Sequence, residues 1–212
     1  MPIHDWTRID VCLFHNFHRG WTVDLKRALN RELPHPDYFA VLERTGRSEA
    51  ELFETDAANY ARRTDRIVIR HRDGRPRAVI EVVSPGNKDS RHAIRSFTAK
   101  AADFLHNGIN FVMIDPFPPG PRDPNGLHPL ICDEFVGLPA EARPADKPLT
   151  VAAYDAGELT AYVEPLAVGD PLPDVPLFLA PGWYVNIPLE RTYTASWAET
   201  PRDTRDLVEP PA

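Results

Sequence analysis

One carboxylate lies inside an otherwise apolar stretch of the sequence, from Ala78 to Val83, in which Glu81 is the only charged residue. Such a run predicts a central strand that is buried on both faces. A carboxylate in that position is costly unless it pairs with a cation or binds a metal ion. Glu81 is therefore the first candidate for chemistry. The alternatives are that Glu81 faces solvent or forms an ion pair with a nearby arginine.

Other acids and cations must come from outside this strand. Two or more carboxylates with a lysine can hold Mg²⁺ and stabilise the charge that develops in phosphodiester hydrolysis. Lys100 lies at the edge of the apolar stripe of a predicted helix, from which it could reach the sheet, whereas exposure to solvent is the alternative. The upstream acids are Glu43 and Glu51, and the available cations are Lys88 and Lys100.

Two further groups of polar residues are candidates for a functional site. Asp115 ends a predicted strand, where ligands of open α/β sheets bind, although capping of the following turn is the alternative. His15 and His18 have an i, i+3 spacing on a predicted helix, but no cysteine or carboxylate stands at a zinc-motif offset. The sequence also lacks a P-loop, a Gly-x-Gly-x-x-Gly motif and a Gly-x-Ser-x-Gly motif. Zinc, nucleotide-binding and α/β-hydrolase sites are therefore not favoured.

Hydrophobic periodicity predicts the elements that must position these residues. Apolar residues three and four apart predict a helix over 14–33, which Pro34 ends. Asp73-Gly74 predicts a hairpin between strands at 66–71 and 77–83, and antiparallel counting places Val68 opposite Glu81. A helix over 90–106 and a strand over 109–114 then predict a βαβ crossover with parallel pairing. Other expected segments are a strand or helical turn at 38–43, a loop at 117–129, strands at 151–154, 159–163 and 183–187, and an extended stretch at 165–181.

The composition differs between the two halves of the chain. The 212 residues carry a net charge of −7, and most of the 23 prolines and of the excess acid lie after residue 115. An acidic chain argues against indiscriminate binding of nucleic acid. A local exception is the segment from Arg62 to Arg77, whose arginines could bind phosphates or could protect an exposed strand edge.

The same composition gives expectations about location. No apolar run reaches the length of a membrane span, and the first residues do not resemble a signal peptide. Cys12 and Cys132 lie far apart without metal-type spacing. We therefore expect a cytoplasmic protein without a membrane partner.

A longer motif carries a resemblance to a known family. The segment Val79 to Lys88, VIEVVSPGNK, occurs with MPIHDW at residues 1–6, the helix bearing Lys100, and Ile114-Asp115. In these features the chain resembles the family named domain of unknown function 4058, over roughly residues 1–190.

A second, shorter resemblance covers residues 79–116. The Uma-type restriction endonucleases have a strand ending in Glu-x-x-Ser-Pro, a lysine in the next helix and a strand ending in Asp-Pro. Here the matching residues are Glu81, Ser84-Pro85, Lys100 and Asp115-Pro116. The resemblance implies a PD-(D/E)xK nuclease-like core, which is a mixed sheet flanked by helices.

Carried over position by position, the resemblance implies a set of site residues. Glu81 matches the second acidic position, and Lys100 matches a lysine that has moved from strand to helix. The sequence departs from the pattern because Val83 stands where the lysine of Glu-x-Lys would be, and no Pro-Asp carries the first acid. Glu51 is the best local substitute for that acid, and Glu43 matches an acid on the preceding element. The implied catalytic residues are Glu81, Lys100 and Glu51, and the implied metal ligands are Glu81, Glu51 and Glu43.

The sequence thus predicts an α/β protein with a nuclease-like core over 1–140, a β-rich, proline-rich extension over 141–200 and a frayed tail over 201–212. The first hypothesis for function is Mg²⁺-dependent hydrolysis of phosphodiester bonds, with nucleic acid as the partner. The second is a non-catalytic binding or scaffold protein on the same fold. A third is a partner-binding module in the proline-rich half, whose aromatic residues otherwise form the core of the extension: Tyr154, Tyr162, Trp183 and Tyr184.

Overall fold

The computed structural model describes residues 3–44, 65–134 and 143–209, and Glu51 lies outside them. The helices are η1 (Trp6–Arg8), α1 (Val11–Glu32), α3 (Pro85–Lys88), α4 (Arg91–His106), α5 (Leu127–Glu134), α6 (Leu189–Ala198) and α7 (Arg202–Val208). The strands are β1 (Tyr38–Arg44), β2 (Asp65–His71), β3 (Pro76–Val82), β4 (Asn110–Asp115), β5 (Leu149–Asp155), β6 (Thr160–Leu166), β7 (Val175–Ala180) and β8 (Trp183–Ile187).

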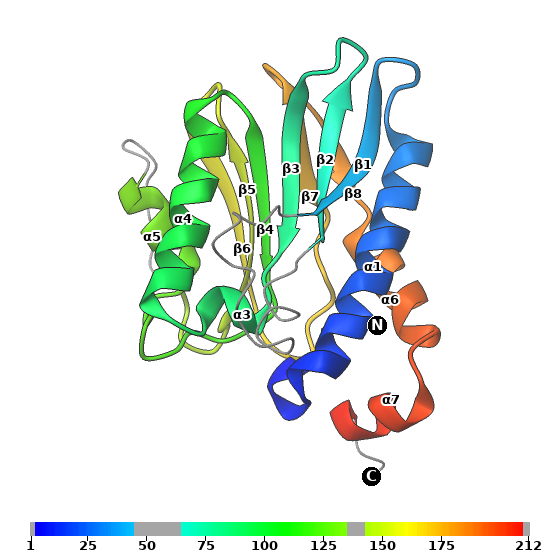
Figure 1. Ribbon diagram of the computed structural model, residues 1–212, viewed down its shortest axis with the longest axis vertical. Helices are drawn as coiled ribbons and strands as arrows, with labels where there is room; N and C mark the ends of the chain where they lie inside the picture. The colour runs from blue at the N-terminus through cyan, green and yellow to red at the C-terminus, as the bar shows by residue number, and fades with distance from the viewer. Residues whose placement is uncertain (1–2, 45–64, 135–142, 210–212) are drawn as a thin grey trace, which may run out of the picture.

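Six strands form one mixed sheet in the order β1-β2-β3-β4-β5-β6, and β7 and β8 form a separate two-stranded sheet. Strands β3 and β4 are parallel and are connected through α4, whereas the other neighbouring pairs are antiparallel. Figure 1 shows α4 and α1 on either side of this sheet, with β7 and β8 behind it. The structure confirms the expected α/β class and a mixed sheet flanked by helices.

Alternate residues of the central strands pack into two hydrophobic clusters, one on each face of the sheet. Ile80 and Val112 belong to the cluster that includes α1 and β7, whereas Val79, Phe111 and Met113 belong to the cluster that includes α4 and α5. Both faces of β3 are therefore covered, as its nearly continuous apolar sequence predicts.

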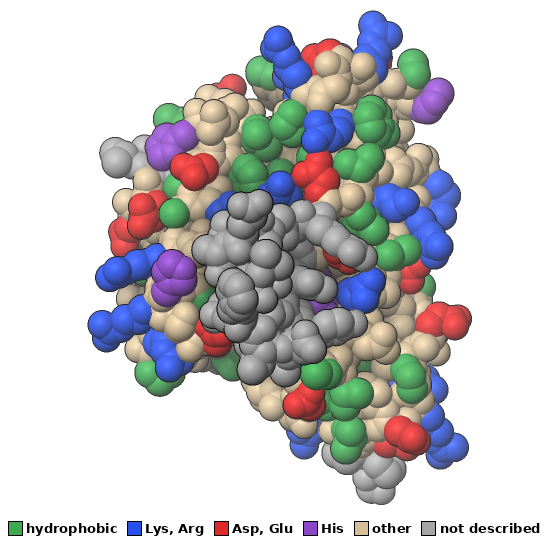
Figure 2. Space-filling model, viewed as in Figure 1, with side chains coloured by type: hydrophobic (Ala, Val, Ile, Leu, Met, Phe, Trp, Pro, Cys, Tyr) green, Lys and Arg blue, Asp and Glu red, His purple; other side chains and the backbone are tan. Residues whose placement is uncertain are grey.

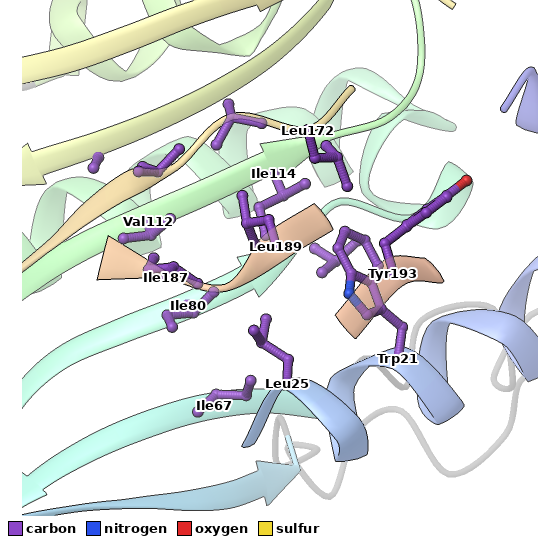
Figure 3. Packing of buried hydrophobic residues seen from close by; sticks show 14 of the residues in the cluster. Trp21, Leu25, Ile67, Ile80, Val112, Ile114, Leu172, Ile187, Leu189 and Tyr193 are labelled. Carbon is purple, nitrogen blue, oxygen red and sulfur yellow. The ribbon is translucent and has the colours of Figure 1, made fainter. Parts of the chain in front are cut away.

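Helix α1 follows from its sequence pattern. The carboxylate of Asp10 caps the helix by accepting a hydrogen bond from the backbone of Cys12. The buried residues Trp21 and Leu25 lie one turn apart, and Figure 3 shows them facing Ile67 of β2 and Tyr193 of α6. The apolar stripe thus joins the sheet to the C-terminal helices.

Several predicted elements are confirmed. They are the helix at α1, the hairpin of β2 and β3, the helix at α4 and its parallel connection to β4. The predicted hairpin register is wrong, because Val68 pairs with Val79 and not with Glu81. The error lies at the turn, because His71 faces Arg75 across it, which centres the turn on Asp73, whereas pairing Val68 with Glu81 requires a centre between residues 74 and 75. A β-bulge between the pairs Ile69–Ala78 and Arg70–Pro76 also shifts the register by one residue.

The second half of the chain differs from the expectations in three ways. Strands β5 and β6 extend the six-stranded sheet, so they are continuous with the predicted core. The proline-rich stretch at 165–181 contains β7, and the loop predicted at 117–129 runs into α5. The tail predicted to fray from residue 201 forms α7, in which Val208 is buried. No helix in the described part of the chain has the length and apolar character needed to cross a membrane.

The hydroxyl of Tyr193 on α6 links that helix to the first described residues. It accepts hydrogen bonds from the backbone N–H of His4 and from Trp6 Nε1–H, both at 3.1 Å. It lies 2.7 Å from His4 Nδ1, to which it can donate its own hydrogen. His4 Nε2 then donates to Glu209 at 2.7 Å, so one hydroxyl satisfies three buried groups.

Tyr193→Phe is expected to lower the free energy of unfolding by about 2–4 kcal/mol, because it leaves buried donors without an acceptor. Urea unfolding followed by circular dichroism measures the change. The control is Tyr162→Phe, since the Tyr162 hydroxyl is exposed and donates to Glu164 at 3.3 Å. That variant should change stability by less than about 0.5 kcal/mol. Equal effects of the two substitutions would contradict this account.

Candidate functional site

Glu81 is buried in the sheet and makes an ion pair with the following helix. Its side chain is 3% exposed, on the face of β3 that α4 covers. Lys100 of α4 donates a hydrogen bond to Glu81 Oε2 at 2.6 Å. The Lys100 side chain is 24% exposed, so the pair lies where the sheet face meets solvent. Of the two alternatives left open for Lys100, the structure shows the one in which its side chain reaches the sheet.

The second oxygen of Glu81 is not bound in this way. Glu81 Oε1 is buried and has no hydrogen-bond partner within the described residues. Arg66 Nη1 on β2 lies 4.0 Å from it. The Arg66 guanidinium also lies over the ring of Phe104 on α4, with 5.3 Å from Cζ to the ring centroid. Arg66 therefore approaches Glu81 without closing a hydrogen bond to it.

Glu43 on β1 is bound to arginines. Arg66 and Arg70 of β2 donate to its two carboxylate oxygens, at 3.2 Å and 2.6 Å. Partial burial opposes ionisation of Glu43, but the hydrogen bonds and charges of the two arginines outweigh it and lower the pKa of Glu43 below its usual value. Glu43 is thus a carboxylate whose charge is already compensated.

These five residues form the candidate site: Glu43, Arg66, Arg70, Glu81 and Lys100. They share one face of the sheet because Glu43 pairs with Arg66 in register, and because Glu81 follows Val79, the partner of Val68, by two positions. Three cations stand against two carboxylates, so the cluster carries one excess positive charge at neutral pH. Such a cluster is suited to an anion, with one buried carboxylate oxygen beside it.

The predicted metal ligands fit a Mg²⁺ site only in part. Glu81 Oε1 is an available oxygen ligand, but Glu43 has both oxygens bound by arginines. Glu51, the third predicted ligand, lies outside the described residues. Within those residues, no group of three or more His, Cys, Asp or Glu side chains could hold a metal ion. The described chain therefore offers one ligand and not a complete site.

Lys88, the other candidate cation, pairs elsewhere. Its ammonium lies 2.9 Å from Asp115 Oδ2 and 2.9 Å from Asp123 Oδ2, and it donates to the backbone carbonyls of Phe117 and Pro118 at 3.2 Å. Asp115 Oδ1 accepts from the backbone N–H of Phe117, so Asp115 also caps the turn after β4. Burial raises the pKa of Asp115 although Lys88 opposes this change. This buried cluster has the character of a structural ion-pair network.

His18 of α1 also has a structural role. It is fully buried, and its Nε2 lies 3.2 Å from the backbone carbonyl of Val82, to which it donates. The neighbouring His15 stacks on His18, with ring centroids 5.8 Å apart. Burial, together with the charge of His15, lowers the pKa of His18 to about 4. Two histidines in this arrangement do not form a metal site with any group in the described chain.

The four aromatic residues named for a partner-binding groove in the proline-rich half do not come together in one surface. Tyr154 is buried against α5, where its hydroxyl lies 2.8 Å from His128 Nδ1. Tyr162, Trp183 and Tyr184 are exposed, the first on β6 and the other two on β8. These side chains therefore belong to different sheets.

The sequence offered both Lys100 and a nearby arginine as partners of Glu81, but it did not single out Arg66 among the arginines or predict that Arg66 and Arg70 bind Glu43. The shifted register concealed Arg66, since counting from the turn brought Val68 to Glu81. Comparison with family models, with curated proteins and with solved structures finds no match to this chain.

Proposed function

We propose that this chain has a PD-(D/E)xK nuclease-like core and hydrolyses phosphodiester bonds in nucleic acid, with Mg²⁺ as the cofactor. The observation that carries the proposal is Glu81, a buried carboxylate in a central strand with Lys100 on one oxygen and no hydrogen-bond partner for the other within the described residues. A carboxylate kept in this state in an apolar strand is costly to stability, which is typical of a functional group.

The residues of the cluster have complementary roles in this proposal. Lys100 and Arg66 offset the negative charge that develops on the phosphate oxygens in the transition state. Glu81 Oε1 is the oxygen that would bind Mg²⁺, and the bound ion would activate the attacking water. Arg70, through its contact with Glu43, holds the β1 side of the cluster in place. All these groups lie on one face of adjacent strands or on α4.

Mg²⁺ enters the proposal through Glu81 alone among the described residues. Proteins often hold this ion with one or two carboxylates together with water and substrate phosphate oxygens. The ion would supply additional charge stabilisation at the phosphate. Glu43 is not proposed as a ligand, because binding an ion would require breaking its bonds to Arg66 and Arg70.

The second candidate is a non-catalytic binding protein on the same fold. The ion pairs of Glu43 with Arg66 and Arg70 favour it, since they hold the cluster together without any reaction. Under this alternative, Glu81 and Lys100 form a structural pair and the arginines bind phosphate.

The test is a cleavage assay on linear, single-stranded and branched DNA and RNA, with Mg²⁺, Mn²⁺ or EDTA. We expect metal-dependent cleavage that Glu81→Gln and Lys100→Met each reduce by at least about 100-fold. The matched control is Glu164→Gln on β6, which should retain wild-type cleavage and exclude a co-purified nuclease. Circular dichroism and thermal unfolding establish that each variant is folded.

Two outcomes would decide against the proposal. Cleavage that persists in Glu81→Gln would show that the cluster is not the catalytic site. Absence of cleavage under every condition, from folded protein that binds nucleic acid, would favour the non-catalytic alternative.

A further inference from the structure

A strip of cationic and aromatic side chains continues from the candidate site toward the β2–β3 turn. We define the basic-aromatic strip as Phe39 of β1, Arg70 of β2 and Arg77 of β3. Phe39 pairs with Arg70 in register, and Arg70 contacts Glu43, which places Phe39 and Arg70 on the face of the sheet that carries the candidate site. Arg77 lies next to Arg70, at the β-bulge where Arg70 pairs with Pro76, and its guanidinium reaches Asp73 of the turn. Figure 2 shows cationic and hydrophobic side chains next to one another in the upper part of the view.

The members of the strip are accessible. Phe39 is 40% exposed, although a phenylalanine on a sheet face is normally covered. The side chains of Arg70 and Arg77 are 33% and 36% exposed. A large apolar ring with a guanidinium on its neighbouring strand is the combination that binds a base together with its phosphate.

The ion pairs of these arginines do not prevent them from binding another anion. Arg77 contacts Asp73 at 3.0 Å across the exposed turn, and Arg70 contacts both Glu43 and the carbonyl of Gly74. The exposed pair of Arg77 with Asp73 contributes little to stability, so a phosphate can replace the carboxylate there, whereas at Arg70 a phosphate can join the existing contacts. Arg75, at the same turn, adds a further positive charge.

The strip is also connected to the site. Arg70 bridges Glu43 of the cluster to Gly74 of the turn. Arg77 and Glu81 are four residues apart on β3, which corresponds to about 13 Å along an extended strand. A flexible chain of a few nucleotides could therefore contact Arg77 and the candidate site together.

We propose that the basic-aromatic strip binds single-stranded nucleic acid and presents it to the candidate site. The inference rests on the proposed function for its choice of substrate. Stacking on Phe39 requires a base whose flat face is free, which a single strand offers and a continuous duplex does not. The arginines bind the phosphates on either side of the stacked base.

The test is fluorescence anisotropy of the full chain with a labelled single-stranded oligonucleotide in EDTA, so that binding is measured without cleavage. Phe39→Ala should weaken binding by about 5- to 100-fold, as expected for the loss of one base–aromatic stack. Arg77→Gln should reduce the slope of log affinity against log salt by about 0.7. A duplex of the same sequence should bind at least ten times more weakly than the single strand.

Two controls match these substitutions. Tyr184→Ala removes an exposed aromatic side chain on β8, and Arg202→Gln removes an exposed guanidinium on α7. Both should leave binding within twofold of the wild type. Because Phe39 is exposed, its substitution is expected to leave the fold intact, which circular dichroism verifies.

The inference would be overturned if the duplex bound as tightly as the single strand, or if Phe39→Ala bound like the wild type. Its failure can be distinguished from that of the proposed function. If the protein cleaves nucleic acid but Phe39→Ala does not weaken binding, only the proposal for the strip fails. If Phe39→Ala weakens binding but the protein does not cleave nucleic acid, only the catalytic proposal fails.

Discussion

Lys88→Met is expected to lower the free energy of unfolding by about 3–5 kcal/mol, which is the usual cost of removing one partner from a buried ion pair. The Lys88 side chain is 10% exposed, and its partners Asp115 and Asp123 are more deeply buried. Without the ammonium, two carboxylates remain next to each other with no cation among the contacts described for them. Urea unfolding at pH 7 measures the loss.

An exposed pair provides the control for this substitution. Lys147 lies 3.9 Å from Asp170, and both side chains are more than a third exposed. Lys147→Met should therefore cost less than about 1 kcal/mol. Asp115→Asn and Asp123→Asn, introduced together into the Lys88→Met variant, should recover part of the stability because they remove the uncompensated charges. If Lys88→Met and Lys147→Met had equal effects, the buried cluster would not have the energetic role assigned to it.

The loss should also depend on pH. Burial raises the pKa of Asp115 above its ordinary value of 3.8 in the folded protein, and Lys88 limits that increase. A raised pKa means that the ionised carboxylate destabilises the fold above its unfolded-state pKa, and that this cost disappears on protonation. Lys88→Met raises the pKa of Asp115 further, so the stability deficit relative to wild type should shrink between pH 7 and pH 4.

The sequence was sufficient to predict the elements around β3. Leu25 and Trp21 repeat at helical spacing, and the apolar run of β3 has the composition of a strand covered on both faces. The turn dipeptide Asp73-Gly74 and the helix that carries Lys100 each lie between two apolar, strand-like segments. Local patterns therefore determine the order of the elements. The contact of Lys100 with Glu81 follows from this order, because α4 must lie over the two parallel strands that it connects.

Other features depend on information that is not local. The centre of the turn and the bulge after Ile69 set the register, and the position of Arg66 beside Glu81 follows from it. Asp123 comes from a proline-glycine loop with no periodicity, so its meeting with Lys88 is set by the path of the loop after β4. Periodic patterns predict which face a residue occupies, but a loop residue acquires its partner only in the folded chain.

Helix α6 is an instructive intermediate case. Leu189, Tyr193 and Trp197 recur at four-residue spacing, which is a helical signal. These residues fall within the β-rich, proline-rich extension predicted over 141–200, in which no helix was predicted from the sequence. The ring contacts between Tyr193 and Trp21, with centroids 5.0 Å apart, show that α6 completes the core against α1. The candidate site and this core use opposite faces of the same sheet.

The last prediction concerns His18, whose burial on the α1 side makes stability dependent on pH. Nε2 donates to the carbonyl of Val82, so the neutral ring carries its hydrogen there, and Nδ1 has no hydrogen-bond partner within the described residues. Protonation would place a second, unsatisfied N–H in the core beside His15. The pKa of about 4 is therefore a consequence of burial and of this hydrogen-bond arrangement.

Because the folded pKa of His18 lies below its ordinary value of 6.5, the unfolded chain binds the proton more readily. The contribution of His18 to stability is thus fully present above pH 6.5 and is lost as the pH falls toward 4. Between pH 7 and pH 5 the wild type should lose about 2 kcal/mol through this residue alone.

The glutamine in His18→Gln does not titrate. Between pH 7 and pH 5, the free energy of unfolding of this variant should therefore fall by about 2 kcal/mol less than that of the wild type. The experiment is urea unfolding at pH 7 and pH 5 for both proteins, with the exposed residue His92 substituted as His92→Gln for control. The control should retain the pH dependence of the wild type. A pH dependence unchanged in His18→Gln would mean that another group is responsible for any acid sensitivity, and that the neutral His18 in contact with Val82 does not stabilise the fold in the way described.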